Sequence, residues 1–234
     1  MRIALLIVML LLPLDLQAAE PVRVAVAANF RSTLEQINAR FEAETGQHIL
    51  LSSASTGVLY NQILHGAPFD LFFAADQTTP LRLAAEVGGS TFCYAMGQLV
   101  MVGGEPDLTP LADPRLSLAI ANPATAPYGA AAMDVLARPE FAAAEGRKLV
   151  RGNNVVQAYQ FWHSGGTDLA LVARALAPDG TPVPGDWHRS LAQHAMVLPR
   201  GADSVAVETY LSWIRSGTVR SQIIEAGYAP VSYT

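Results

Sequence analysis

The first regular pattern in the chain is Val22-Arg23-Val24-Ala25-Val26-Ala27, followed by the short loop Ala28-Asn29-Phe30. A mainly apolar run of this length predicts a buried β-strand. The next residues, Arg31–Thr45, place apolar side chains three and four positions apart, which predicts a helix that ends at Gly46. A strand, a small loop and a helix in this order are typical of α/β proteins.

The same order recurs along the chain. Residues 48–52 predict a second strand, and the small polar loop Ser52-Ser53-Ala54-Ser55-Thr56-Gly57 precedes a predicted helix at 58–65. Further strands are predicted at 70–74, 116–121 and 167–172, and further helices at 80–86, 129–137, 155–163, 203–214 and 218–226. This alternation indicates α/β sheets with helices on both faces.

Two long extended runs, residues 94–102 and 195–199, bracket a middle α/β unit. We therefore predict two α/β domains, or lobes, joined by two crossover strands. The predicted first lobe contains residues 19–95 together with 199–234, and the second contains residues 96–198. A cleft between two such lobes is a usual place for a small ligand.

The composition indicates a globular protein that is not basic. The chain has 234 residues, of which 51% are apolar and 15% charged, so it is long and apolar enough to bury a core. Its formal net charge is -5 and no basic cluster occurs, which argues against binding to nucleic acid. Cys93 is the only cysteine, so no disulfide forms within the chain.

Residues 1–18 have the pattern of a secretory signal peptide. Arg2 supplies a positive charge, an apolar run extends from Ile3 to Leu12, and Ala18 provides a small residue before the expected cleavage. The apolar run is too short to span a bilayer comfortably. We therefore expect the mature chain to be exported.

Four loops that open predicted helices are candidates for an anion site. They contain Asn29, Ser55 with Thr56, residues 126–129 and residues 153–155. The start of a helix carries unpaired backbone N–H groups and the positive end of the helix dipole, so it binds anions without Lys or Arg. The alternative is helix capping, which is the common role of Ser, Thr and Asn at such positions. Convergence of these loops in one cleft favours a small oxyanion as ligand.

A series of short motifs extends over the whole mature chain. They are Val24-Ala25-Val26-Ala27-Ala28-Asn29-Phe30, Phe41-Glu42-Ala43-Glu44-Thr45-Gly46, Ser53-Ala54-Ser55-Thr56-Gly57, Gly66-Ala67-Pro68-Phe69-Asp70, Ala74-Ala75-Asp76, Asn122-Pro123, Ala126-Pro127-Tyr128-Gly129, Asn154-Val155 and Ala226-Gly227-Tyr228. In this order and spacing the chain resembles the periplasmic molybdate-binding receptors of ABC transporters. The resemblance implies a two-lobe type II periplasmic-binding-protein fold that closes over molybdate or tungstate.

The resemblance also implies an oxyanion-binding set. Its members are Ala28, Asn29, Ser55, Thr56, Tyr128 and Val155. Tyr128 is expected to contribute a backbone or phenolic donor, and Val155 its backbone N–H. Ala28 stands where related receptors offer a threonine hydroxyl, and Ala173 where many have a tyrosine, so two donors of the family pattern are absent.

Further expectations follow from the resemblance. The chain is expected to be a monomer in the periplasm, to have no enzymatic activity and no cofactor, and to deliver its ligand to a membrane ABC permease. Molybdenum would be held as an oxyanion by the residues above, with no direct protein ligand to the metal.

Two alternatives stay open. The same kind of site would suit a receptor for another anion, such as sulfate or phosphate. A secreted hydrolase would instead use Ser55 or Thr56 as nucleophile with a histidine as base. The five histidines have no standard zinc spacing.

Overall fold

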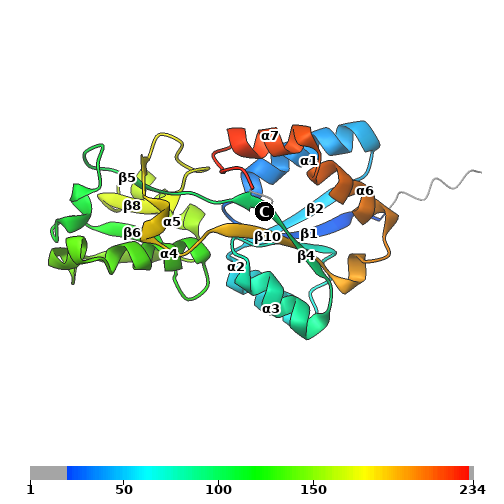
Figure 1. Cartoon of the computed structure of the whole chain (residues 1–234), viewed down its shortest axis with the longest axis horizontal. Coiled ribbons are helices and arrows are strands. Elements are labelled where there is room, and N and C mark those ends of the chain that lie inside the picture. The colour runs from blue at the N-terminus through cyan, green and yellow to red at the C-terminus, as the bar shows by residue number, and fades with distance from the viewer. Residues whose placement is uncertain (1–19, 232–234) are drawn as a thin grey trace, which may run out of the picture.

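The computed structural model describes residues 20–231, so the predicted signal peptide at 1–18 lies outside the described residues. Two five-stranded sheets form the centres of two lobes that lie side by side along the longest axis of the molecule (Figure 1). The first sheet has the order β2 (Ile49–Ala54), β1 (Val22–Ala27), β3 (Leu71–Phe73), β10 (Ala192–Val197) and β4 (Ser90–Met96). The second has the order β7 (Leu149–Gly152), β6 (Leu118–Ala121), β8 (Leu169–Ala173), β5 (Leu99–Val102) and β9 (Thr181–Pro182).

Each sheet has a parallel part and an antiparallel part. β1 pairs in parallel with β2 and β3, and β6 pairs in parallel with β7 and β8. The strands next to the crossovers are antiparallel to their neighbours: β10 to β3 and β4, and β5 to β8. The loops that follow the parallel strands lie at the carboxyl ends of those strands, where α/β sheets usually bind ligands.

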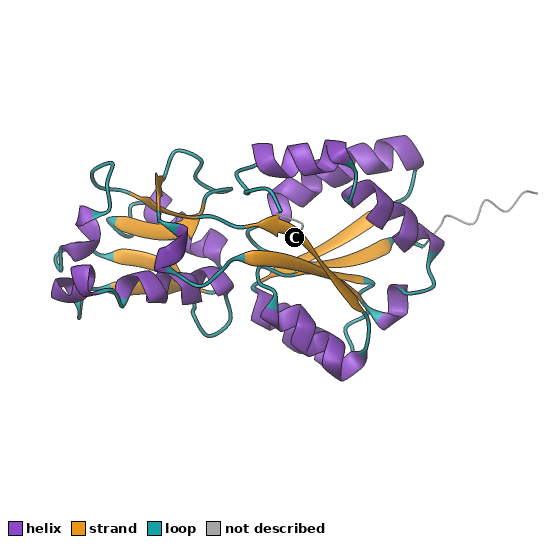
Figure 2. Ribbon diagram, viewed as in Figure 1, coloured by secondary structure: helices purple, strands orange, loops and turns teal. Residues whose placement is uncertain are grey.

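Helices cover both faces of the first sheet (Figure 2). They are α1 (Arg31–Thr45), α6 (Val205–Ile214) and α7 (Gly217–Glu225) on one face, and α2 (Thr56–Leu64) and α3 (Thr78–Val87) on the other. Alternate residues of β1 divide between the two cores, because successive side chains of a strand point to opposite faces. Val24 and Val26 pack with α1, α6 and α7, whereas Ala25 packs with α2 and α3.

The second lobe is built around α4 (Pro127–Leu136) and α5 (Val155–His163). Short 3-10 helices complete the chain at Thr109–Ala112, Pro139–Ala144, Gly185–Trp187 and Pro199–Gly201. The core of this lobe also contains Ala27 and Ala75 from the first lobe. Apolar packing therefore continues from one lobe to the other. Within residues 20–231, no helix combines the length and apolar character needed to cross a membrane.

The extended run expected at 94–102 is divided between the two sheets. β4 ends at Met96 in the first sheet, and β5 begins at Leu99 in the second. Gly97 lies in the first crossover, between these two strands. Its N–H donates at 2.9 Å to the O of Leu191, which lies in the second crossover, the segment that leads from the second sheet into β10. The two crossovers are therefore hydrogen-bonded to each other.

The expected division of the lobes is wrong at its second boundary. The sequence pattern places residues 96–198 in the second lobe, but β10 pairs with β3 and β4 of the first sheet. An extended pattern predicts a strand but not the sheet to which the strand belongs. Here β10 lies between β3 and β4 in the first sheet. The short strand β7 was also missed, because only two of its four residues are large and apolar.

Candidate functional site

A small cavity lies where the two lobes meet. Its volume is only about 10 Å³ in this form of the protein, which is about the space of one water molecule. All six residues of the implied oxyanion-binding set line it: Ala28, Asn29, Ser55 and Thr56 from the first lobe, and Tyr128 and Val155 from the second. Pockets for organic molecules usually exceed about 300 Å³. The site in this form is therefore far too small for an organic molecule.

The loop after β1 brings Ala28 and Asn29 to the cavity. The Ala28 N–H donates to Ala54 O at 2.9 Å, so Ala28 contributes only apolar wall. The Asn29 Nδ2 donates to Gln193 Oε1 (2.9 Å) and to the Tyr228 hydroxyl (3.2 Å), so this side chain does not cap α1. The backbone N–H of Asn29 has no acceptor among residues 20–231. That N–H is therefore the donor that this loop offers.

Ser55 and Thr56 lie at the start of α2. Ser55 is only 4% exposed, it makes no capping bond, and its Oγ has no hydrogen-bond partner in the described part of the chain. Capping is therefore the wrong interpretation of Ser55. Thr56 Oγ1 accepts from the Ala75 N–H at 3.0 Å, which leaves its hydroxyl hydrogen free to donate elsewhere. A buried hydroxyl without a partner is costly, which indicates a ligand at this place.

Tyr128 lies in the first turn of α4, one residue after Pro127. Proline is favoured at the first position of a helix, because its missing N–H has no partner there in any case. The Tyr128 hydroxyl accepts from Gln193 Nε2 at 3.1 Å and is engaged at the crossover. Its backbone N–H has no acceptor within the described ranges. Of the two expected donors, the backbone group is the one left free for the cavity.

Val155 is the first residue of α5. The preceding Asn154 does cap the helix, because its Oδ1 accepts from the Gln157 N–H at 3.0 Å. Capping is thus the right interpretation for Asn154. The Val155 N–H comes before the first helical hydrogen bond and has no acceptor among the residues that the structure describes.

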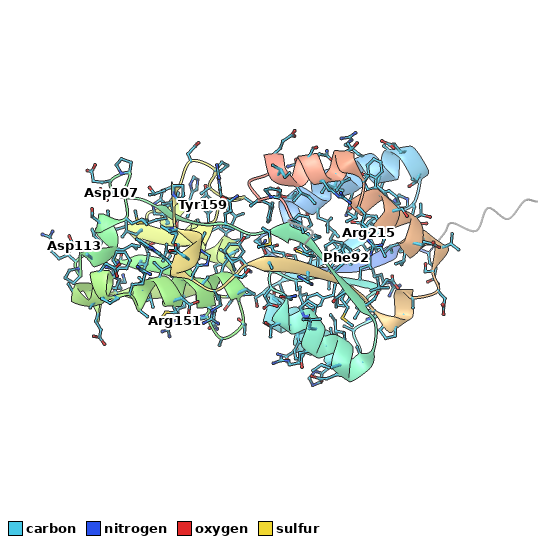
Figure 3. The ribbon with its side chains drawn as sticks, in the orientation of Figure 1. Phe92, Asp107, Asp113, Arg151, Tyr159 and Arg215 are labelled. Atoms are coloured by element: carbon cyan, nitrogen blue, oxygen red, sulfur yellow. The ribbon has the colours of Figure 1, made fainter. Side chains whose placement is uncertain are left out.

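The cavity is lined by hydrogen-bond donors without formal charges. None of its lining residues is Lys, Arg, His, Asp or Glu. Charged groups lie elsewhere: Asp113, 2.7 Å from Arg115, lies at the far end of the second lobe, and Arg215 lies over the ring of Phe92 in the first lobe (Figure 3). Free N–H groups, hydroxyls and helix starts favour a ligand that only accepts hydrogen bonds and carries negative charge.

A buried polar cluster lies beside the cavity, and three of its five members are not predicted from the sequence as site residues. It consists of Asn29, Tyr94, Tyr128, Gln193 and Tyr228, and we call it the junction cluster. Burial raises the pKa of each of its three tyrosines, so the phenols stay neutral and act as hydrogen-bonding groups. A single glutamine in an extended run gives no sequence signal for such a role.

The arrangement does not suit a Ser/Thr hydrolase. No histidine lines the cavity, and Ser55 Oγ has no base within hydrogen-bond distance in the described part of the chain. Within residues 20–231, no three or more His, Cys, Asp or Glu side chains gather at a place that suits a metal ion.

Comparison with known proteins agrees with this geometry. The model of a family described as bacterial extracellular solute-binding protein matches residues 22–229. The chain belongs to this family. It is 40% identical to the molybdate-binding protein ModA of Azotobacter vinelandii, over 91% of this chain and 90% of that protein. It is 35% identical to ModA of Rhodobacter capsulatus, over 90% and 89% of the two chains.

A solved structure supports the same family membership. The periplasmic molybdate-binding protein of Azotobacter vinelandii superposes with a TM-score of 0.81 at 33% identity, covering 90% of this chain and all of that one. The expected two-lobe type II fold is therefore confirmed. The relatives are solute-binding proteins, so the expectation that the chain is not an enzyme is confirmed as well.

Proposed function

We propose that this chain captures molybdate, or tungstate, between its two lobes and delivers it to a membrane ABC permease. The observation that carries the proposal is the buried Ser55 hydroxyl, which faces an uncharged cavity lined by free N–H groups. The names of the relatives support molybdate as the ion. Location in the periplasm, action as a monomer and the absence of a nucleic-acid partner belong to the same proposal.

A dianion suits this site for an electrostatic reason. Fixed N–H and O–H dipoles favour the negative oxygens, and each helix start adds about 0.3–1 kcal/mol. A neutral site also avoids the cost of burying a Lys or Arg without its partner when the ligand leaves. Because donors come from both lobes, the ligand binds the closed form better than the open one and shifts the population toward it.

Titration of the mature chain with three anions tests the proposal. Because metal–oxygen bonds are longer than sulfur–oxygen bonds, sulfate leaves some donors unpaired, and each unmade bond costs about 1–3 kcal/mol. We expect molybdate and tungstate to bind at least about 100-fold tighter than sulfate in isothermal titration calorimetry. Tighter binding of sulfate or phosphate would identify a receptor for another anion.

Lobe closure brings Gly57 against Thr125. The Gly57 N–H of the first lobe donates to Thr125 O of the second at 2.8 Å, and a Cβ at Gly57 would lie 3.1 Å from both Thr125 Cα and Thr125 O. Gly57→Ala should therefore hold the lobes slightly apart. We expect molybdate affinity to fall about tenfold, the usual size of a small overpacking penalty.

Gly217→Ala is the matched control, because Gly217 also lies in the first turn of a helix but an added Cβ there would meet no atom within 4 Å. This variant should bind molybdate as the parent chain does. Equal affinities of the two variants in calorimetry would show that the Gly57–Thr125 contact does not contribute to closure.

A further inference from the structure

A single glutamine connects the two halves of the cavity. Gln193 lies in β10 next to the second crossover and is fully buried, with 0% exposure. The pairing of β10 with β4 shifts register between Gln193 and His194. Such a bulge redirects side chains and is frequent beside functional sites. The side chain of Gln193 is thereby placed in the junction cluster.

The oxygen and the nitrogen of the Gln193 side-chain amide form hydrogen bonds with different lobes. Its Oε1 accepts from Asn29 Nδ2 (2.9 Å) and from the Tyr94 hydroxyl (2.8 Å), both in the first lobe. Its Nε2 donates to the Tyr128 hydroxyl (3.1 Å) in the second lobe. Asn29 and Tyr128 also line the cavity, one from each lobe, and both have a backbone N–H without an acceptor among the described residues. One side chain therefore connects two of the proposed ligand positions.

The crossover leaves room for this bridge at Gly97. A Cβ there would lie 2.4 Å from the Tyr128 hydroxyl and 2.6 Å from Gln193 Nε2, closer than any real Cβ approaches. A side chain at position 97 would displace the bond between the lobes. Glycine is thus required at position 97 because the side chains of Tyr128 and Gln193 come close to its Cα. Its backbone conformation does not require glycine, since Gly97 is not among the residues with positive φ.

We propose that Gln193 is a positioning residue that sets the separation of the donors on the two lobes. The proposal rests on the proposed function, and it goes further by assigning the control of ligand size to a residue outside the cavity. While the bridge is formed, the Asn29 and Tyr128 N–H groups are held at one spacing, which a larger tetrahedral oxyanion matches. Without the bridge the spacing varies, so preference for molybdate over sulfate should fall.

A double-mutant cycle tests the bridge. The variants are Gln193→Met, Tyr128→Phe and both together, and none of them removes a backbone N–H from the cavity. We expect each single variant to bind molybdate about tenfold more weakly, and the molybdate-to-sulfate affinity ratio to fall by a similar factor. The double variant should bind molybdate no more weakly than the weaker of the two single variants, because each single substitution already removes the hydrogen bond between Gln193 and Tyr128. Strictly additive losses, or an unchanged ratio, would overturn the proposal.

Tyr210→Phe is the matched control. The Tyr210 hydroxyl is buried and donates to Asn38 Oδ1 at 2.6 Å, but both residues lie in the first lobe. Removing this bond should lower the melting temperature without changing the affinity or the anion ratio. If Tyr210→Phe weakened binding as much as Tyr128→Phe, a general loss of stability would explain both results.

A measurement without ligand separates this proposal from the proposed function. In a Cys93→Ser background, nitroxide labels at Glu44→Cys and Glu145→Cys report the distance between exposed positions on the two lobes by pulsed electron paramagnetic resonance. Gln193→Met should broaden that distance distribution, and Tyr210→Phe should not. If the parent chain bound neither molybdate nor tungstate, the proposed function would fail, while this comparison would still test the bridge. An unchanged distribution in Gln193→Met would contradict it.

Discussion

The double substitution Ser55→Ala with Thr56→Ala is expected to weaken molybdate binding by at least about 100-fold, because two hydroxyl donors to a dianion are removed. Ser55→Ala alone should weaken binding without lowering stability, since its Oγ has no partner among the described residues. Thr56→Ala should also lower the free energy of unfolding by about 1–3 kcal/mol, because the Ala75 N–H loses its acceptor. Calorimetry and thermal denaturation measure the two effects.

Ser216→Ala provides the contrast for Ser55→Ala. Both serines occupy the residue before a helix, but only Ser216 accepts a capping bond, from the Val219 N–H at 3.3 Å. Ser216→Ala should lower stability by about 1 kcal/mol and leave binding unchanged. If the Ser55/Thr56 double variant kept the parent affinity while folded, the α2 loop would not belong to the site.

The substitution Val155→Pro is expected to reduce molybdate affinity by about 100-fold while the protein stays folded. It removes a free N–H and puts a ring carbon in its place, in the wall of a cavity of only about 10 Å³. Proline suits the first position of a helix, and Asn154 already has the extended backbone (φ -152°, ψ 177°) that a residue before proline prefers. Circular dichroism verifies the fold, and calorimetry measures the affinity.

Val155→Ala separates the backbone from the side chain. The N–H stays, and only buried methyl groups are lost, so stability should fall by about 1–2 kcal/mol while affinity changes little. Parent-like binding by Val155→Pro would exclude the N–H as a donor. A comparable loss in Val155→Ala would instead assign the effect to packing.

Much of the fold follows from local patterns. The helix at Arg31–Thr45 is predicted to the residue, because apolar spacing marks its buried face and Gly46, at φ 70°, ends it. β1 is predicted equally well, because an apolar run between two polar loops suits a buried strand. The partner of each strand is less predictable, since β10 returns to the first sheet through pairing with residues more than 90 positions away.

The candidate site is likewise only partly predictable from the sequence. Loops that open helices are recognisable, and the resemblance to known receptors points to the six residues that line the cavity. Which loop residues cap and which face a ligand is not recognisable, because Ser55 and Asn154 occupy equivalent positions before their helices. The difference arises from the neighbours: Asn154 Oδ1 accepts from the Gln157 N–H of its own helix, whereas Ser55 Oγ has no partner among the described residues and lies at the cavity.

The amino-acid sequence by itself determined the alternation of strands and helices and the small polar loops between them, because these depend on side-chain spacing and on backbone groups close in the chain. Only the tertiary structure decided that four helix starts meet at one cavity and that Gln193 connects Asn29 to Tyr128. Those contacts join segments 65 and 164 positions apart. Pairing over such distances depends on the packing of both lobes, which no local pattern records.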